Sequence, residues 1–109
     1  MLYSFGGGDD GATPYAGLTE LDHIFFGTTQ AGGGTGCGGH GCGTIFSIRP
    51  DGTYKVQHRF QGGSDGQVPQ SQLVVWNGAL YGTTSYGGGG PCTNEFYGVG
   101  CGTVFRLHP

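Results

Sequence analysis

The sequence is short of charge, and above all of positive charge. Only 10% of its 109 residues are charged, and four Lys and Arg stand against seven Asp and Glu, for a net charge of −3. Binding to nucleic acid needs a basic surface that neutralises phosphates, so this composition argues against a nucleic-acid partner. The chain also lacks an apolar run long enough to span a bilayer, and we expect no membrane insertion.

We expect neither a leader peptide nor a helix. Met1 is followed directly by strand-like residues, so we expect a mature form or an excised segment of a longer chain. Gly or Pro interrupts every window long enough for a helix, which predicts an all-β fold. Disorder is disfavoured, because aromatic residues make up 13% of the chain and disordered chains are usually poor in them.

Glycine is what the sequence has in excess, at 27 of 109 residues, against a usual share of about 7%. The glycines follow an internal repeat. With a shift of 55 positions, residues 27–29 (GTT) fall on 82–84 (GTT). With a shift of 59, residues 42–46 (CGTIF) fall on 101–105 (CGTVF), so the second copy holds four extra residues (59 − 55) between its cysteines. A repeat of this length indicates a propeller, an array or a solenoid.

Each copy is predicted to form a four-stranded antiparallel sheet. Asn77-Gly78 favours a two-residue hairpin turn, and four such strands are the size of one propeller blade. We therefore expect a β-propeller fold with two blades in a single domain, 1–109, in which repeat 1 covers 1–55 and repeat 2 covers 56–109. A small β-sandwich made of both units is the alternative. The predicted strands are 16–21, 24–29, 44–49 and 54–60 in the first copy, and 71–76, 79–84 and 103–108 in the second.

The ends of the chain bear on assembly. Residues 1–5 match 56–60, the end of a fourth strand, and the second copy shows only three strands. Two blades cannot close a ring, since propellers have typically about four to eight. We expect the N-terminal strand to complete a blade of a neighbouring chain or adjoining module, in a head-to-tail homo-oligomer or a longer array.

The repeat also resembles a known family. Both copies are similar to the GloVer-type tandem repeats of bacterial exported proteins, and the resemblance covers nearly the whole chain. It implies a secreted or surface-anchored, propeller-like protein, and it brings no catalytic residues. The segments that carry it are LYSFGGGDDGATPYAGL (2–18), FFGTTQAGG (25–33), CGTIFSIRPDGT (42–53), LYGTTSYGGGG (80–90) and CGTVFRL (101–107).

The cysteines suggest two kinds of chemistry. Cys37, His40 and Cys42 form a set of zinc-type ligands in the segment CGGHGC. The second copy keeps Cys92 and Cys101 but has no His between them and a longer loop. We therefore favour two disulfides, Cys37–Cys42 and Cys92–Cys101, over a metal site, with pairing across the copies as the alternative. Paired cysteines indicate an oxidising compartment, outside the cell or on its surface.

The long loops are predicted to share one face, where binding residues usually lie. Tyr86, Phe96 and Tyr97 stand there among glycines, and exposed rings stack on sugars, which predicts a glycan-binding rim. Packing against a neighbouring blade or subunit is the alternative. Asp10 and Asp65 belong to Asp-Gly turns on the same face, with bound calcium as the alternative, and we expect no other cofactor.

Enzymatic signals are weak. Residues 62–66 (GGSDG) match a nucleophile elbow, which needs a following helix that this sequence does not predict. Glu20 and Glu95 have no acidic counterpart in the other copy, which disfavours a paired-carboxylate glycosidase. The leading hypothesis is a non-enzymatic exported propeller module for assembly or adhesion, with glycan binding on the long-loop face. The second is a polysaccharide-active hydrolase with its site on that face or in the channel of the ring.

Overall fold

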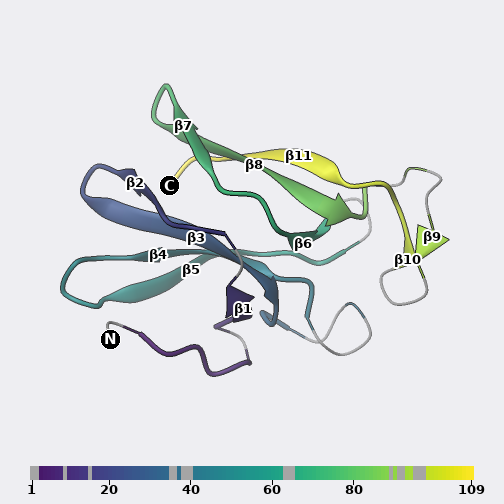
Figure 1. Cartoon of the computed structure of the whole chain (residues 1–109), viewed down its shortest axis with the longest axis horizontal. Coiled ribbons are helices and arrows are strands. Elements are labelled where there is room, and N and C mark those ends of the chain that lie inside the picture. The colour runs from purple at the N-terminus through teal and green to yellow at the C-terminus, as the bar shows by residue number, and fades with distance from the viewer. Residues whose placement is uncertain are drawn as a thin grey trace.

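The computed structural model of the chain describes residues 3–8, 10–14, 16–34, 37, 41–62, 66–88, 90, 93–94 and 98–109. Every regular element in these ranges is a β-strand, and none is a helix. All but two of the strands form two antiparallel sheets, one from each half of the chain, which lie one over the other (Figure 1). The all-β prediction is confirmed. Two sheets alone close neither a barrel nor a ring, so the propeller stays a prediction.

The first sheet has five strands. β1 (Ala12–Pro14) and β2 (Thr19–Leu21) both pair with one edge of β3 (Ile24–Ala31), so together they act as one interrupted strand. On its other edge β3 pairs with β4 (Thr44–Ile48), which pairs in turn with β5 (Tyr54–Arg59). The sheet therefore follows the four-strand plan predicted for one repeat.

The second sheet repeats this plan with one strand fewer. β6 (Gln67–Pro69) and β7 (Val74–Trp76) share one edge of β8 (Ala79–Tyr86), and β11 (Thr103–Leu107) pairs with the other. A separate hairpin of β9 (Thr93–Asn94) and β10 (Gly98–Val99) lies between the cysteines of the second copy, where the extra residues fall.

The structure corrects several predicted strand limits. The first strand of each sheet starts earlier than predicted, at Ala12 and Gln67, and is broken before its second part. Each early part ends in a proline, which has no N–H to donate but is tolerated in an edge strand. The second strands run two residues further, to Ala31 and Tyr86. Residues 3–5 belong to no strand of this chain.

The hairpin turns take the predicted form. Asp22 and His23 have φ angles of 54° and 65°, and Asn77 and Gly78 have 49° and 75°. Positive φ at both central residues defines the type I′ turn, whose twist suits antiparallel strands. The β2–β3, β4–β5 and β7–β8 turns lie toward one side of the molecule and the long connections toward the other (Figure 1).

Equivalent hydrogen bonds between threonines occur inside each of the two sheets. In the first, the hydroxyls of Thr29 and Thr44 lie 2.8 Å apart, and the Thr44 amide donates to Thr29 Oγ1 over 3.1 Å. In the second, Thr84 and Thr103 do the same over 2.8 and 3.0 Å. The repeat seen in the sequence is therefore a repeat of structure down to single polar contacts.

The core lies between the sheets, and we call this contact the inner interface. Because side chains alternate along a strand, Phe26 and Ile45 point from the first sheet toward the second. Leu73 and Leu80 point back, and each fully buried side chain of this kind contributes about 1.5–3 kcal/mol. The buried members of the cluster are Phe26, Cys42, Ile45, Phe60, Leu73 and Leu80, with Leu21, Ile24, Val75, Phe105 and Leu107 packed against them.

Candidate functional site: the outer faces of the two sheets

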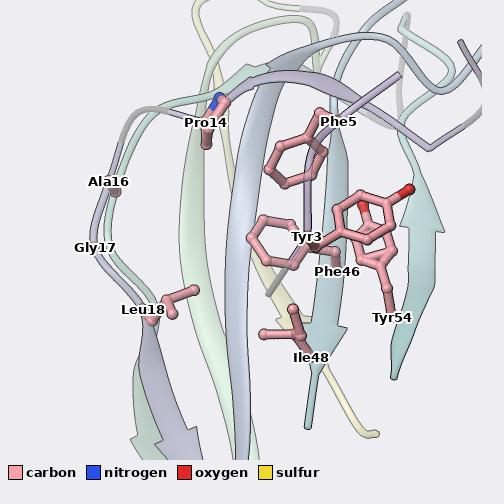
Figure 2. A pocket seen from close by; sticks show the side chains of 9 residues that line it. All are labelled: Tyr3, Phe5, Pro14, Ala16, Gly17, Leu18, Phe46, Ile48 and Tyr54. Atoms are coloured by element: carbon pink, nitrogen blue, oxygen red, sulfur yellow. The ribbon is translucent and has the colours of Figure 1, made fainter. Parts of the chain in front are cut away.

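The face of the first sheet that points away from the inner interface carries an apolar groove of about 440 Å³. Aromatic rings form one side of it: Tyr3 stacks on Tyr54 with centroids 3.9 Å apart, and Phe5 packs edge-on against Phe46 at 5.2 Å. The rings and aliphatic side chains surround an open centre (Figure 2). The residues that line this groove are Tyr3, Phe5, Pro14, Ala16, Gly17, Leu18, Phe46, Ile48 and Tyr54.

Asp10 fixes the aromatic side of the groove. Its carboxylate accepts the Tyr3 hydroxyl at 2.5 Å and the Gly6 amide at 2.7 Å, and its carbonyl oxygen accepts the Tyr54 hydroxyl. The hydrogen bonds from Tyr3 and then from Gly6 lower the pKa of Asp10, and the contact with Asp10 raises the pKa of Tyr3. Desolvation raises the pKa of Tyr54. The predicted ligand residue Asp10 is thus a structural acceptor.

Leu18 lies at the opposite side of the groove and is half exposed. A Cβ placed on Gly27 would lie 2.7 Å from Phe46 Cζ and 3.0 Å from Leu18 Cδ2, so this glycine lets both side chains lie flat on β3. Gly82 plays the same part in the second sheet, beneath Phe105 and Leu73. There, however, the leucine is buried in the inner interface.

The second sheet has its own outer face, which we call the Trp76 face. Val74, Trp76 and Val104 are exposed on it, and the Trp76 ring meets Tyr81 edge-on at 6.4 Å. A shallow apolar hollow lies among Val74, Trp76 and Tyr81. Large apolar side chains gathered on one surface are typical of an interaction site.

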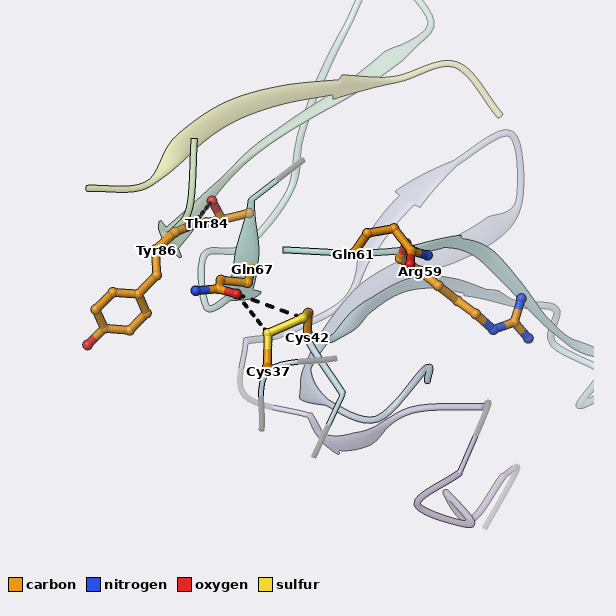
Figure 3. Close-up of a disulfide and its surroundings, with 7 residues drawn as sticks. All are labelled: Cys37, Cys42, Arg59, Gln61, Gln67, Thr84 and Tyr86. Atoms are coloured by element: carbon orange, nitrogen blue, oxygen red, sulfur yellow. Dashed lines mark hydrogen bonds between the residues drawn. A yellow bond between two sulfur atoms is a disulfide. The ribbon is translucent and has the colours of Figure 1, made fainter. Parts of the chain in front are cut away.

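The disulfide Cys37–Cys42 closes the first long loop, with an S–S distance of 2.03 Å and a Cα separation of 5.3 Å. This confirms the predicted pair; zinc binds deprotonated thiolates, and sulfur atoms joined in a disulfide are not thiolates. Gln67 Oε1 lies 2.8 Å from the sulfur of Cys37 (Figure 3). A disulfide sulfur has no hydrogen to donate, so a hydrogen bond here requires the amide to be turned over, with its NH₂ group toward sulfur.

The buried disulfide lies where the two sheets meet and indicates an oxidising compartment. Cys42 is buried in the inner interface, and its carbonyl accepts the Val68 amide at 2.7 Å. Cys101, the counterpart of Cys42, is exposed and is also disulfide-bonded. Its predicted partner, Cys92, lies outside the described residues.

The predicted ligand residues are not gathered into one site. Tyr86 is half-buried at the end of β8, where it pairs with Gln67 rather than standing in a loop. Phe96, Tyr97, Asp65 and His40 lie outside the described residues. Within the described ranges, no group of three or more His, Cys, Asp or Glu residues is placed to hold a metal ion. Nor do those ranges contain a helix that is long and apolar enough to cross a membrane.

Comparison of the chain with protein-family models, with curated proteins and with solved structures gives no match.

Proposed function

We propose that this chain is a non-enzymatic β-propeller repeat unit whose role is assembly through the faces of its sheets. One observation carries the proposal, the exposure of matched residues. Leu18 is 49% exposed while its counterpart Leu73 is 3% exposed, and Val104 is 79% exposed while its counterpart Ile45 is 1% exposed. The outer faces thus hold the same kinds of residue that the inner interface buries, and exposing them in water is unfavourable.

An open sheet edge supports the propeller architecture. β4 pairs with β3 on one edge and β5 on the other, whereas β11 pairs with β8 alone among the described strands. Unpaired strand edges tend to recruit another strand. In the proposed architecture residues 1–5, which match the end of the fourth strand, complete the sheet of a neighbouring copy.

Export to the cell surface or the medium belongs to the same proposal. It is supported by the Cys37–Cys42 disulfide, which is stable in an oxidising compartment, and by the resemblance to exported tandem repeats. A module of this kind would contribute to adhesion by building an extended or ring-shaped surface from identical units.

Self-association of the purified, oxidised chain tests the proposal. We expect sedimentation velocity between about 1 and 200 μM to show a mass that rises with concentration or a stable oligomer. Association driven by apolar burial should persist in 0.5 M NaCl, because salt screens charges and leaves apolar contacts intact. A chain that remains monomeric across this range would contradict the proposal.

Carbohydrate binding is the second candidate, favoured by the exposed pair of Trp76 and Tyr81. Flat aromatic surfaces take up the apolar faces of sugar rings. Trp76 is the only tryptophan of the chain, so its fluorescence reports directly on this surface. Titration with soluble oligosaccharides should change the emission if the pair binds sugars, and an unchanged spectrum at millimolar sugar would argue against it.

A further inference from the structure

Resting on the proposed assembly role, we infer that the outer face of the second sheet docks into the groove of the first sheet of a second copy of this chain. The contact repeats the inner interface in the same register. Its two sides are different surfaces, the Trp76 face, which includes Val104, and the groove beside Leu18 and Phe46, so the association is head to tail.

The groove side matches the surface that the second sheet presents to the inner interface. Leu18 stands where Leu73 stands, and Phe46 where Phe105 stands, each pair lying over an equivalent glycine. The N-terminal aromatic residue completes the match. Phe5 packs on Phe46 at 5.2 Å as Phe60 packs on Phe105 at 5.4 Å.

The Trp76 face matches the surface that the first sheet presents to the inner interface. When the two sheets are compared, β3 aligns with β8 at a shift of 55, and β4 aligns with β11 at a shift of 59. Tyr81 then takes the place of Phe26, and Val104 takes the place of Ile45. Trp76 likewise occupies the position of Leu21, which packs against the core cluster. An apolar residue therefore stands at each of these positions on the uncovered face.

The inner interface is thus a template for the outer one, since the same molecule already contains one copy of the contact in a packed state. When the groove of one copy binds the Trp76 face of another, the pair still has one uncovered groove and one uncovered Trp76 face at its two ends. Such a heterologous contact continues until the rotation between copies closes a ring, or else forms an open filament. An isologous dimer would instead join two like faces and stop.

Two blocking variants test the inference. Leu18→Asp puts a carboxylate in the groove, and Val104→Asp puts one on the Trp76 face. Both residues are exposed, so the folded chain should tolerate the change. Each variant alone should associate at least about 100-fold more weakly than the wild type, because an unpaired charge is costly to bury. An equimolar mixture should form a 1:1 dimer that grows no further, since each partner retains one intact face. His23→Asp, on the exposed β2–β3 turn, is the matched control and should associate as the wild type does.

The single tryptophan shows which face is covered. When Trp76→Phe is added to the Val104→Asp variant, the only tryptophan in the mixture is Trp76 of the Leu18→Asp variant, on its intact Trp76 face. The emission of this tryptophan should shift to shorter wavelength on mixing. A wild type that associates, with variants that do not restore a dimer on mixing, would overturn the head-to-tail docking while leaving the assembly role standing. Blocking variants that associate normally would also overturn it, as would a shift of Trp76 that requires added sugar. A monomeric wild type would overturn both proposals.

Discussion

The two sheets of this protein share a strand plan, apart from β5, and also share a hairpin turn and a threonine pair, but several of their matched residues lie in opposite environments. Leu73 is buried because the first sheet covers it, and Leu18 is half exposed because no part of the described chain covers the groove. Local sequence therefore determines how each sheet forms, while its neighbour determines which of its faces becomes core. The following changes test how far the two sheets are equivalent.

The largest difference is expected between Leu73→Ala and Leu18→Ala. Leu73→Ala leaves a cavity in the inner interface and should lower the free energy of unfolding by about 2–5 kcal/mol. Leu18→Ala removes a half-exposed side chain and should cost the monomer less than about 1 kcal/mol. Urea unfolding at low micromolar concentration, followed by circular dichroism, gives both values. Equal losses would show that the groove is already packed within the monomer.

Next in size is the effect of the cysteines. Cys42→Ala should lower the free energy of unfolding by about 2 kcal/mol through loss of the disulfide, plus about 1 kcal/mol for the buried sulfur. Cys101→Ala should cost only the disulfide contribution, because Cys101 is exposed. Unfolding with and without dithiothreitol separates the two contributions. After reduction, a Cys42→Ala variant as stable as the reduced wild type would contradict the packing role of Cys42.

The threonine pairs should behave alike. Thr29→Val and Thr84→Val each remove a hydroxyl that accepts a backbone amide and leave that amide without its partner. We expect each change to cost about 1–3 kcal/mol, with the two values within about 1 kcal/mol of each other. Thermal unfolding of the two variants checks this. A loss confined to one sheet would show that the repeated hydrogen bonds are not energetically equivalent.

The smallest effect concerns acid. The pKa of Asp10 is lowered below its ordinary value of 3.8, chiefly by the hydroxyl of Tyr3, so its carboxylate stabilises the fold above about pH 4. That contribution should disappear as the pH falls through the lowered pKa, releasing Tyr3 and changing its near-UV circular dichroism. Asp10→Asn should abolish this acid transition. The acid transition of Tyr3 should persist in Asp51→Asn. The pKa of Asp51 is also lowered, but by hydrogen bonds from Thr53 and not by Tyr3.

Much of the fold could be predicted because the sequence contains two copies of one repeat. Asn77-Gly78 identified a hairpin, and the shift of 55 transferred it to Asp22-His23, which is a weaker turn signal alone. The starts of the first strands could not be predicted in this way. Thr13 and Val68 hold φ angles of 57° and 58°, a left-handed conformation that β-branched residues rarely adopt. Each lies between two residues that pair with β3 or β8, so strand pairing, which the local sequence does not show, places them there.

The candidate site was less predictable than the fold. The glycine-rich loops favoured ligand residues such as Tyr86, and the same argument gave no prediction for the faces of the sheets. A usable signal was present in the repeat. Two equivalent units that share one interface must leave one apolar face of each uncovered, so half of the apolar set was bound to lie outside. The sequence alone could not decide whether Leu18 or Leu73 was the buried one, because both stand in the same local pattern.

The glycines of the long loops limit how this protein can change. A methyl group on Gly41 would lie 2.3 Å from the carbonyl oxygen of Gly32, and one on Gly100 would lie 2.2 Å from that of Gly87. Backbone touches backbone there, which leaves no room for new side chains at the loop bases. Diversity between copies must therefore enter as added length farther out, which is where the second copy carries its extra hairpin. A designer wishing to graft a new function onto this scaffold should insert residues between the cysteines instead of substituting at the crowded bases.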